Sequence, residues 1–387
     1  MQYRSLTLVG VVVTLVAGLT ACGPGEDGAA GPKPQTVSSP AAKIDIAPGD
    51  GTRKWRLDKP IAISVLDGTL ASVSVTSKGH ALDGQLSPDQ RSWKSIGVLK
   101  PGAEYTVSVA AANQDGLKAT STSSFTTLSP SARAQVWMQP AAGSTVGVGM
   151  PVVLNFSAPV AKSRQAAVEK GLSVTSDPLV EGDWKWMTAQ QVQWRPKAYW
   201  PSGVKVKVRA DLAGVELAKG VWGASKTAKT DFTIGSEMIS TVDVDKHTMT
   251  VRRGGKVIRT IPITTGKAGY ETRNGVKVIM THEATRRMDA ASTGTDPDDP
   301  EYYNILVHYA MRLTYSGEFL HAAPWSVGSQ GRANVSHGCT GMSMSNAQWM
   351  FDHSKIGDVV VYKNSKRPLE WGNGFTAWDV SYDKWTA

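Results

Sequence analysis

Four consecutive residues near the C-terminus, Ser336-His337-Gly338-Cys339, combine a thiol, an imidazole and a glycine. The chain has 2 cysteines, and the other, Cys22, lies in a segment with a different expected use. Cys339 therefore has no partner for an internal disulfide, although exported proteins normally pair their thiols or lack them. A single thiol beside a histidine is typical of a nucleophile, because a nearby imidazole raises the fraction of thiolate. We predict a nucleophile here rather than a buried, inert cysteine.

A thiol nucleophile needs a base that accepts its proton, and donors that hold the oxyanion formed on attack. Two histidines are candidate bases: His337, two residues before the thiol, and His321, which ends the apolar-alternating run 318–320. Gly338 permits a sharp backbone turn. The amides of residues 337–339 can then converge on one oxygen, as in an oxyanion hole.

The elements that hold these residues belong to a strand-rich unit that we predict to span residues 236–363. The expected elements are strands at 241–245, 248–252, 257–263, 276–280 and 358–362, and a helix capped by Ser345 that runs to about His353. The acidic, proline-rich stretch 296–301 predicts part of a long loop, and such loops tend to be lids or binding loops. We expect the tryptophan-rich C-terminal subdomain, 364–387, to pack back onto this unit.

Two further strand-rich units are predicted before it, at 46–129 and 130–235. Apolar and polar residues alternate with period two, as in 71–75, 105–109 and 204–208, with turn residues between the runs. This pattern is typical of small antiparallel sandwiches. Both units are immunoglobulin-like in size and rhythm, and neither shows a convergent cluster of titratable residues, so we interpret them as spacers.

The N-terminus predicts export. Arg4 precedes an apolar run, 6–21, that is short for a membrane span but suits a signal peptide, predicted at 1–21. Residues 19–22 resemble a bacterial lipobox, in which Cys22 becomes the lipidated first residue of the mature protein; an ordinary secretory signal cleaved nearby is the alternative. Residues 22–45 then form a flexible tether. The expected location is a membrane lipoprotein that faces the periplasm or cell wall.

The composition narrows the range of partners. The formal net charge is +9, which either favours anionic surfaces such as wall polymers and lipid headgroups or is spread out and aids solubility. Nucleic acid is not expected as a partner, because the chain is exported and has no dense Lys/Arg patch interleaved with aromatic residues.

The last third of the chain resembles the L,D-transpeptidase catalytic domain, the YkuD-like fold. That family's signature is a histidine, a spacer and then Ser/Thr-His-Gly-Cys; here His321 is followed by fourteen residues and then by 336–339. Segments 315–317, 323–326 and 345–349 are similar to the actinobacterial, wall-anchored branch. The resemblance implies a mostly β chain with two immunoglobulin-like sandwiches, a β-rich YkuD-like domain with a short helix, and a C-terminal subdomain.

The resemblance also implies roles for individual residues. Cys339 would be the acylated nucleophile and His321 its general base, oriented by the backbone carbonyl of residue 322. His337 would shape the site, and the amides around Gly338 and Cys339 would hold the oxyanion. The substrate-binding positions that the resemblance implies are Met288, Tyr303, Trp325 and Ser336.

The chain departs from the family pattern at two positions. Residue 322 is Ala where relatives often have Ser, which matters little if only its carbonyl acts. Gly341 stands where the family usually has Asn or Arg, so a side chain that would order the substrate or the site is missing. An active enzyme is still expected, because the nucleophile and the base are both present.

The implied reaction is acyl transfer between peptidoglycan stem peptides, with donor and acceptor stems as partners, no metal or organic cofactor, and carbapenem-type β-lactams as inhibitors. A 3→3 cross-link would form through a cysteine thioester. One alternative is an L,D-carboxypeptidase that uses water as acceptor; another is a catalytically weak wall-binding protein. A metal site of His321, His337 and Cys339 is a further alternative, although the fourteen-residue spacer is not a usual zinc spacing.

Overall fold

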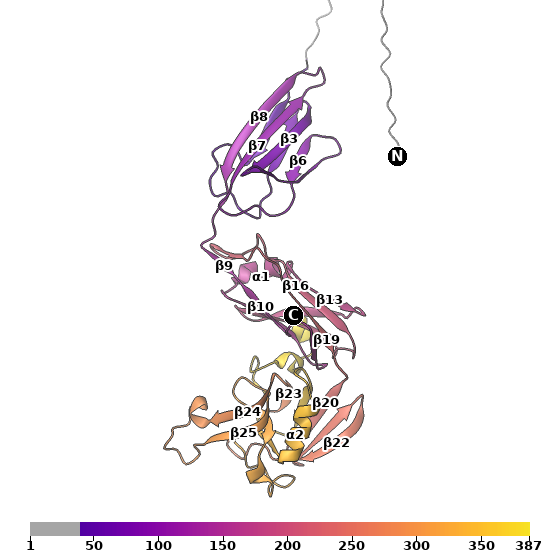
Figure 1. Ribbon diagram of the computed structural model, residues 1–387, viewed down its shortest axis with the longest axis vertical. Coiled ribbons are helices and arrows are strands. Elements are labelled where there is room, and N and C mark those ends of the chain that lie inside the picture. The colour runs from indigo at the N-terminus through magenta and orange to yellow at the C-terminus, as the bar shows by residue number, and fades with distance from the viewer. Residues whose placement is uncertain (1–38) are drawn as a thin grey trace, which may run out of the picture.

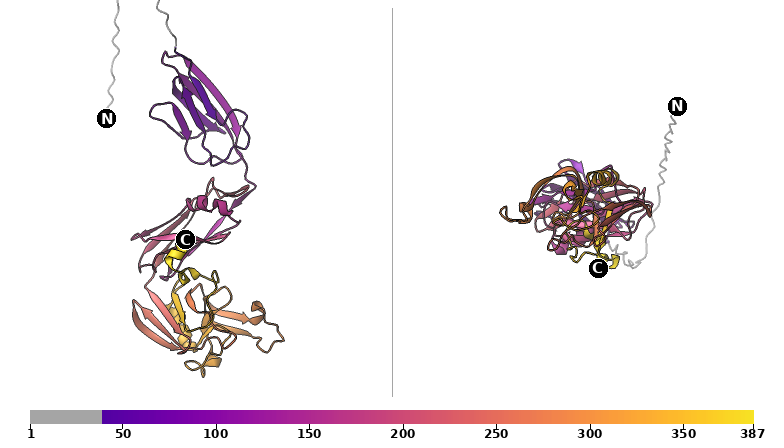
Figure 2. Two further views of the ribbon diagram at one scale, coloured as in Figure 1. Left: turned by 180° about the vertical axis from the view of Figure 1, so that it is seen from behind. Right: turned by 90° about the horizontal axis from the view of Figure 1, so that it is seen from below.

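The computed structural model describes residues 39–387. Three strand-rich units follow one another along the long axis of the molecule, and the end-on view of Figure 2 shows them stacked over one another (Figures 1 and 2). The predicted mostly β fold class is confirmed. The predicted signal peptide, Cys22 and most of the tether lie outside the described residues, and the unit boundaries stay predictions. Within residues 39–387, no helix is both long and apolar enough to cross a bilayer.

The first unit is a sandwich of two four-stranded antiparallel sheets, ordered β1-β2-β6-β5 and β4-β3-β7-β8. Alternation places one face of each strand inside; in β7, Tyr105, Val107 and Val109 are buried. The strands are β1 Lys43–Ala47, β2 Ala62–Leu66, β3 Thr69–Ser77, β4 His80–Ala81, β5 Gly84–Leu86, β6 Ser92–Ser95, β7 Glu104–Ala112 and β8 Lys118–Thr126.

The second unit pairs the sheets β10-β12-β15-β14 and β11-β19-β16-β13, with a small sheet β17-β18-β9 beside them. Its elements are β9 Ala132–Ala134, β10 Val136–Gln139, β11 Ser144–Val146, β12 Val152–Phe156, α1 Lys162–Glu169, β13 Leu172–Asp177, β14 Gly182–Thr188, β15 Gln191–Pro196, β16 Lys205–Ala210, β17 Glu216–Ala218, β18 Val221–Gly223 and β19 Ala228–Ile234.

The third unit holds the motif residues. A five-stranded sheet, β22-β21-β20-β28-β23, and a four-stranded sheet, β24-β25-β26-β27, enclose an apolar core together with helix α2. Its elements are β20 Met238–Asp243, β21 Thr248–Arg253, β22 Lys256–Pro262, β23 Gly275–Val278, β24 Thr281–Asp289, β25 Asn304–Arg312, β26 Phe319–Ala322, β27 Thr340–Met342, α2 Met344–His353 and β28 Val359–Lys363. Short 3-10 turns lie at Ala290–Thr293, Pro324–Ser326 and Thr376–Asp379, and helix α3 spans Tyr382–Thr386.

One local expectation was wrong, and another was incomplete. Helix α2 is capped by Ser343, whose hydroxyl accepts the amide of Asn346 at 3.3 Å, and not by Ser345. The C-terminal tail packs on the second unit as well as on the third: Trp385 Nε1 donates to the carbonyl of Asp183 in the second unit at 2.9 Å. The tail therefore ties two units together.

The two joints between units differ in chemistry. The second and third units share one apolar cluster, because Val278, Val359 and Phe375 pack with the core of the second sandwich. Between the first and second units, Arg56 pairs with Glu216 at 2.9 Å and lies over the ring of Trp222. The joint between the second and third units, here called the lower joint, is packed like a protein core. The joint between the first and second units includes a polar contact.

Asp358 is a buried carboxyl at the lower joint, 2% exposed. Its Oδ2 accepts the amide of Lys355 at 2.7 Å, while Oδ1 has no hydrogen-bond partner. Burial raises its pKa from 3.8 to about 7, against the opposing effect of the Lys355 amide. The folded state therefore holds a proton that the unfolded state releases, and the stability that this gives is lost as the pH rises from about 4 towards 7.

We expect Asp358→Asn to raise the melting temperature at pH 8 and to change it little at pH 4, since asparagine removes a charge that burial disfavours. Each pKa unit corresponds to about 1.4 kcal/mol. Differential scanning calorimetry at both pH values measures the effect, with Asp352→Asn on the exposed face of α2 as the matched control. An equal change at the two pH values would contradict this account.

Candidate active site

One strand pair brings the predicted base and nucleophile together. β26 and β27 run parallel, with His321 opposite Gly341 and Leu320 opposite Thr340. Paired residues point to the same face of a sheet, as do residues two apart in one strand. Cys339, directly before β27, therefore lies on the face that carries His321.

A cavity of about 290 Å³ opens over this face. It is lined by every described residue predicted for the site except Gly338, namely Met288, Tyr303, His321, Trp325, Ser336, His337 and Cys339. Thr264, Ile305 and Gly341 also line it. Side chains from three places thus surround one cavity. These are the hairpin of β24 and β25 with its loop, here called the β24–β25 arm, strand β26, and the motif turn at residues 336–339.

His321 is held in a defined tautomer. It is 4% exposed, and its Nδ1 lies 2.9 Å from the carbonyl oxygen of Ala322, which can only accept a hydrogen bond. Nδ1 must therefore carry the proton, which leaves the lone pair of Nε2 as an acceptor. Burial lowers the pKa of His321, although the Ala322 contact opposes this. The result is a neutral imidazole that is set up to take a proton at Nε2.

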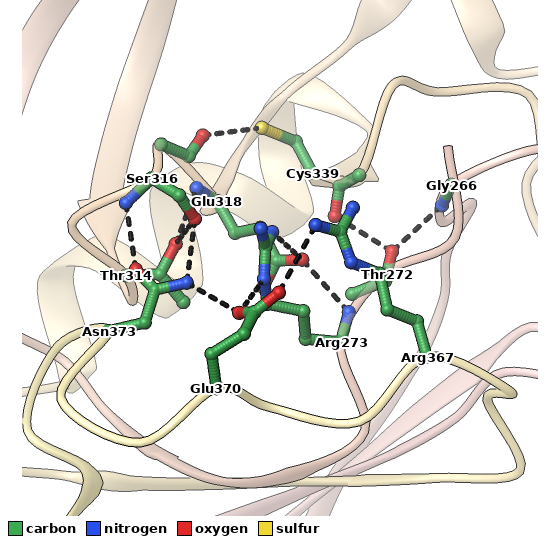
Figure 3. Close-up of polar contacts among 12 residues, drawn as sticks. Gly266, Thr272, Arg273, Thr314, Ser316, Glu318, Cys339, Arg367, Glu370 and Asn373 are labelled. Carbon is green, nitrogen blue, oxygen red and sulfur yellow. Dashed lines mark hydrogen bonds and ion pairs between the residues drawn. The ribbon is translucent and has the colours of Figure 1, made fainter. Parts of the chain in front are cut away.

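The Cys339 thiol is partly buried and donates to the carbonyl of Gly317 at 3.5 Å (Figure 3). Burial raises its pKa to about 12; the Glu318 carboxylate adds to the rise, and Lys277 and Arg312 oppose it. No hydrogen bond joins His321 to Cys339 within residues 39–387. The Cys339 thiol is therefore directed to the Gly317 carbonyl. Catalytic hydrogen bonds are often long or misaligned in the absence of substrate.

The turn between His337 and Cys339 is fixed from both sides. Ser336 Oγ donates to the carbonyl of Cys339 at 2.6 Å and accepts the amide of Gly338 at 3.1 Å, while Thr272 Oγ1 donates to the carbonyl of Gly338 at 2.7 Å. Gly338 has φ +120°, which favours glycine. The Gly338 amide, expected to help hold the oxyanion, is thus directed to Ser336.

His337 contacts the acidic loop that was predicted as a lid or binding loop. Its Nε2 lies 2.6 Å from Glu301 Oε2, and its ring lies between those of Tyr270 and Tyr303. Glu301 is also paired with Lys267, and these two contacts lower its pKa. The acidic stretch 296–301 is therefore in contact with the motif, as its prediction as part of a lid or binding loop requires.

The predicted substrate-binding positions line the cavity. Met288, 9% exposed, and Tyr303 come from the β24–β25 arm, and burial raises the pKa of Tyr303 to about 12, so its phenol stays protonated. Trp325 also lines the cavity; it is 60% exposed, and its ring lies 6.0 Å from that of His321. A chain bound in the cavity would therefore meet a thioether, a phenol and an indole.

Two buried charged groups near the thiol are not indicated by the sequence. Lys277 and Glu318 form an ion pair whose side chains are 0% and 5% exposed. Lys277 stands between Val276 and Val278 and has the alternation of a solvent-facing residue. No pattern in the sequence marks it as buried, because the covering elements come from distant parts of the chain.

Gly341 has no room for a side chain. A Cβ there would lie 2.9 Å from Ala323 Cβ and 3.0 Å from Thr264 Cγ2. Its backbone pairs with Thr264 on one side and with His321 on the other. The missing Asn or Arg is thus matched by neighbours that already fill its place.

We expect Gly341→Asn to destabilise the fold by about 1–3 kcal/mol, the usual cost of overpacking. Chemical denaturation measures this cost. Thr264→Ser is the matched partner variant, because it deletes the crowding methyl and keeps the hydroxyl that donates to Ala333 at 2.8 Å. Combined with Gly341→Asn it should recover part of the loss, whereas an additive or larger loss would be evidence against this packing account.

No group of three or more His, Cys, Asp or Glu residues in the described part of the chain is arranged to hold a metal ion.

Comparisons with protein families match two regions of the chain. A family model for the bacterial Ig domain matches residues 52–216, and one for the L,D-transpeptidase catalytic domain matches residues 237–361.

Two curated relatives come from Mycobacterium tuberculosis. L,D-transpeptidase 2 is 35% identical, with 100% of this chain and 96% of the relative covered. L,D-transpeptidase 5 is 32% identical, with 90% and 77% covered.

Solved structures of L,D-transpeptidases are also similar to this chain. An LD transpeptidase in complex with imipenem is 36% identical with a TM-score of 0.52, covering 60% of this chain and 99% of that one. L,D-transpeptidase 3 from Mycobacterium tuberculosis, in complex with a faropenem-derived adduct, is 31% identical with a TM-score of 0.50, covering 59% and 97%.

Proposed function

Because the chain belongs to the L,D-transpeptidase family, we propose that it forms 3→3 cross-links in peptidoglycan through a thioester on Cys339. The arrangement of His321 supports this proposal most directly. Its Nδ1 is bound to Ala322, its Nε2 is left as an acceptor, and its ring lines the same cavity as the thiol.

The first half-reaction begins when the thiol leaves the Gly317 carbonyl and turns towards His321. Nε2 takes the thiol proton, and the sulfur attacks the carbonyl carbon at the L-centre of the third stem residue. Backbone amides at the motif turn hold the oxyanion. The Cys339 amide is the first candidate, because the Gly338 amide already donates to Ser336 at 3.1 Å.

The intermediate collapses when the bond to the terminal D-Ala breaks. His321, now an imidazolium, gives its proton to the departing amine, so free D-Ala leaves and the tripeptide acyl group stays on sulfur. The side-chain amine of a second stem then attacks the thioester. It loses a proton to His321, the new amide forms, and the sulfur leaves and is reprotonated.

The donor stem would bind in the cavity that Trp325, Met288 and Tyr303 line. A β-lactam carbonyl can enter the same position, and opening of its ring on Cys339 would give a stable acyl-enzyme. The relative solved with imipenem and the one with a faropenem-derived adduct favour carbapenem-type β-lactams and penems as such inhibitors.

Membrane attachment through a lipidated Cys22 is part of the proposal, with the cavity facing the periplasm or cell wall. Metabolic labelling with a fatty acid tests it: the wild type should carry label, and Cys22→Ala should not. Label retained by Cys22→Ala would contradict lipidation at that residue.

Incubation of the full chain with a disaccharide-tetrapeptide, followed by mass spectrometry, tests the reaction. Loss of D-Ala together with a cross-linked dimer is the expected result. Tripeptide without dimer would instead show an L,D-carboxypeptidase with water as acceptor. An unchanged substrate, together with no carbapenem adduct on Cys339, would leave the wall-binding alternative.

A further inference from the structure

A buried charge stands behind the nucleophile without any part in the reaction described above. The Lys277 ammonium has an exposed fraction of 0%; it is paired with Glu318 and lies 3.7 Å from the ring centroid of Tyr362. A charge in the interior is costly unless it is paired, and apolar residues of similar size are often at least as stable. Stability alone does not explain an ion pair at this place.

The pair connects to the thiol along two routes. Glu318 directly follows Gly317, whose carbonyl accepts the thiol at 3.5 Å. Tyr362, under the ammonium, shares a 2.7 Å hydrogen bond with Thr340, which directly follows Cys339. Lys277 thus contacts Glu318, which lies next to Gly317, and Tyr362, which is hydrogen-bonded to Thr340 next to Cys339.

The Glu318 end of the pair is fixed independently of Lys277. Glu318 Oε1 accepts from the Arg273 amide at 2.8 Å and from its guanidinium at 3.2 Å (Figure 3). Arg273 also pairs with Glu370, which accepts from Asn373 at 2.8 Å, and Asn373 Oδ1 accepts the amide of Ser316 at 2.9 Å. Arg273 can therefore keep Glu318 ionised and in place when Lys277 is replaced.

Few charges face the thiol from the elements packed around it. Glu318, directly before β26, is the anion, and it raises the pKa of Cys339; Lys277 from β23 and Arg312 from β25 are the cations, and they lower it. Tyr303 and Tyr362 have raised pKa values and His321 a lowered one, so all three are neutral at pH 7. Removing Lys277 would leave one opposing cation.

We propose that Lys277 is a positioning residue for acylation: acting through Glu318 and through Tyr362 and Thr340, it holds the Cys339 sulfur in place and supplies the positive charge that favours its thiolate. The link to acylation rests on the proposed function. The effect on the thiol itself does not.

Burial lowers the pKa of Lys277 itself to about 8, so the test is kept below that value. It measures the alkylation of Cys339 by iodoacetamide in the full chain, followed by mass spectrometry of the Cys339 peptide, between about pH 6 and pH 7.5. In this range the rate is proportional to the thiolate fraction, and one unit of pKa changes it tenfold. Lys277→Met should alkylate on the order of tenfold more slowly. In Lys277→Met with Glu318→Gln both charges are absent, and the rate should return towards that of the wild type.

The matched control is Lys185→Met. Lys185 also uses its ammonium in intramolecular contacts, donating to the carbonyls of Lys384 and Trp385 at 2.9 Å, but it lies in β14 of the second unit. This variant should alkylate at the wild-type rate whatever its melting temperature. Wild-type alkylation in Lys277→Met, or a double variant as slow as the single one, would overturn the proposal.

Carbapenem adduct formation is followed on the same samples. A wild type without an adduct would contradict the proposed function, while the alkylation series would still decide the role of Lys277.

Discussion

Replacing Cys339 with alanine is expected to abolish acylation while the protein stays folded. The thiol is the attacking atom in the proposed reaction, and no other side chain lining the cavity is a nucleophile of comparable strength. Its hydrogen bond to Gly317 is a 3.5 Å contact of a sulfur atom, so little stability is lost with it. Intact-mass spectrometry after incubation with a carbapenem measures the adduct, and the melting temperature reports the fold.

Cys339→Ser separates the thiol from its geometry. The hydroxyl can keep a hydrogen bond to Gly317, but it is far less nucleophilic and ionises less readily than the thiol. It should form adduct extremely slowly, if at all. An adduct on Cys339→Ala that maps to another residue would contradict the assigned nucleophile.

Replacing His321 with alanine is expected to slow acylation at least about 100-fold, the usual scale of a general base. The neutral imidazole with its proton on Nδ1 is the acceptor set up for the thiol proton. Stopped-flow measurement of carbapenem acylation across pH 6–9 gives the rate. The difference in rate between His321→Ala and the wild type should shrink as the pH rises, because more of the thiol is then ionised without the help of His321.

His353→Ala is the matched control for this variant. His353 is exposed on α2, where its ring stacks on that of Trp349 outside the cavity. It should acylate at the wild-type rate. A similar loss in both variants, or a pH-independent loss in His321→Ala, would contradict the role of His321 as base.

The sequence predicted the site better than its surroundings. The motif and its spacing correctly placed His321 and Cys339 at one cavity, while their roles as base and nucleophile stay predictions. The cap of α2 was placed at Ser345 rather than Ser343, since both serines offer a hydroxyl and only the entry of the chain into the helix distinguishes them.

The other features that the sequence did not predict depend on tertiary contacts. Lys277 has the alternation of a surface residue, and its burial depends on Tyr362 and Glu318, far away in the sequence. The destination of the Gly338 amide depends on the rotamer of Ser336. The path of the tail depends on carbonyls of the second unit, such as that of Asp183, which no side-chain pattern reveals.

The contrast between the two joints has a mechanical consequence. An apolar cluster shared by two units couples their unfolding, so the second sandwich and the catalytic unit should melt as one cooperative block. Polar joints allow domain motion by default, so the first sandwich can swing against that block. The second and third units would then form one rigid body that holds the cavity at a fixed distance from the joint with Arg56, and bending at that joint would change the position of the cavity relative to the first sandwich.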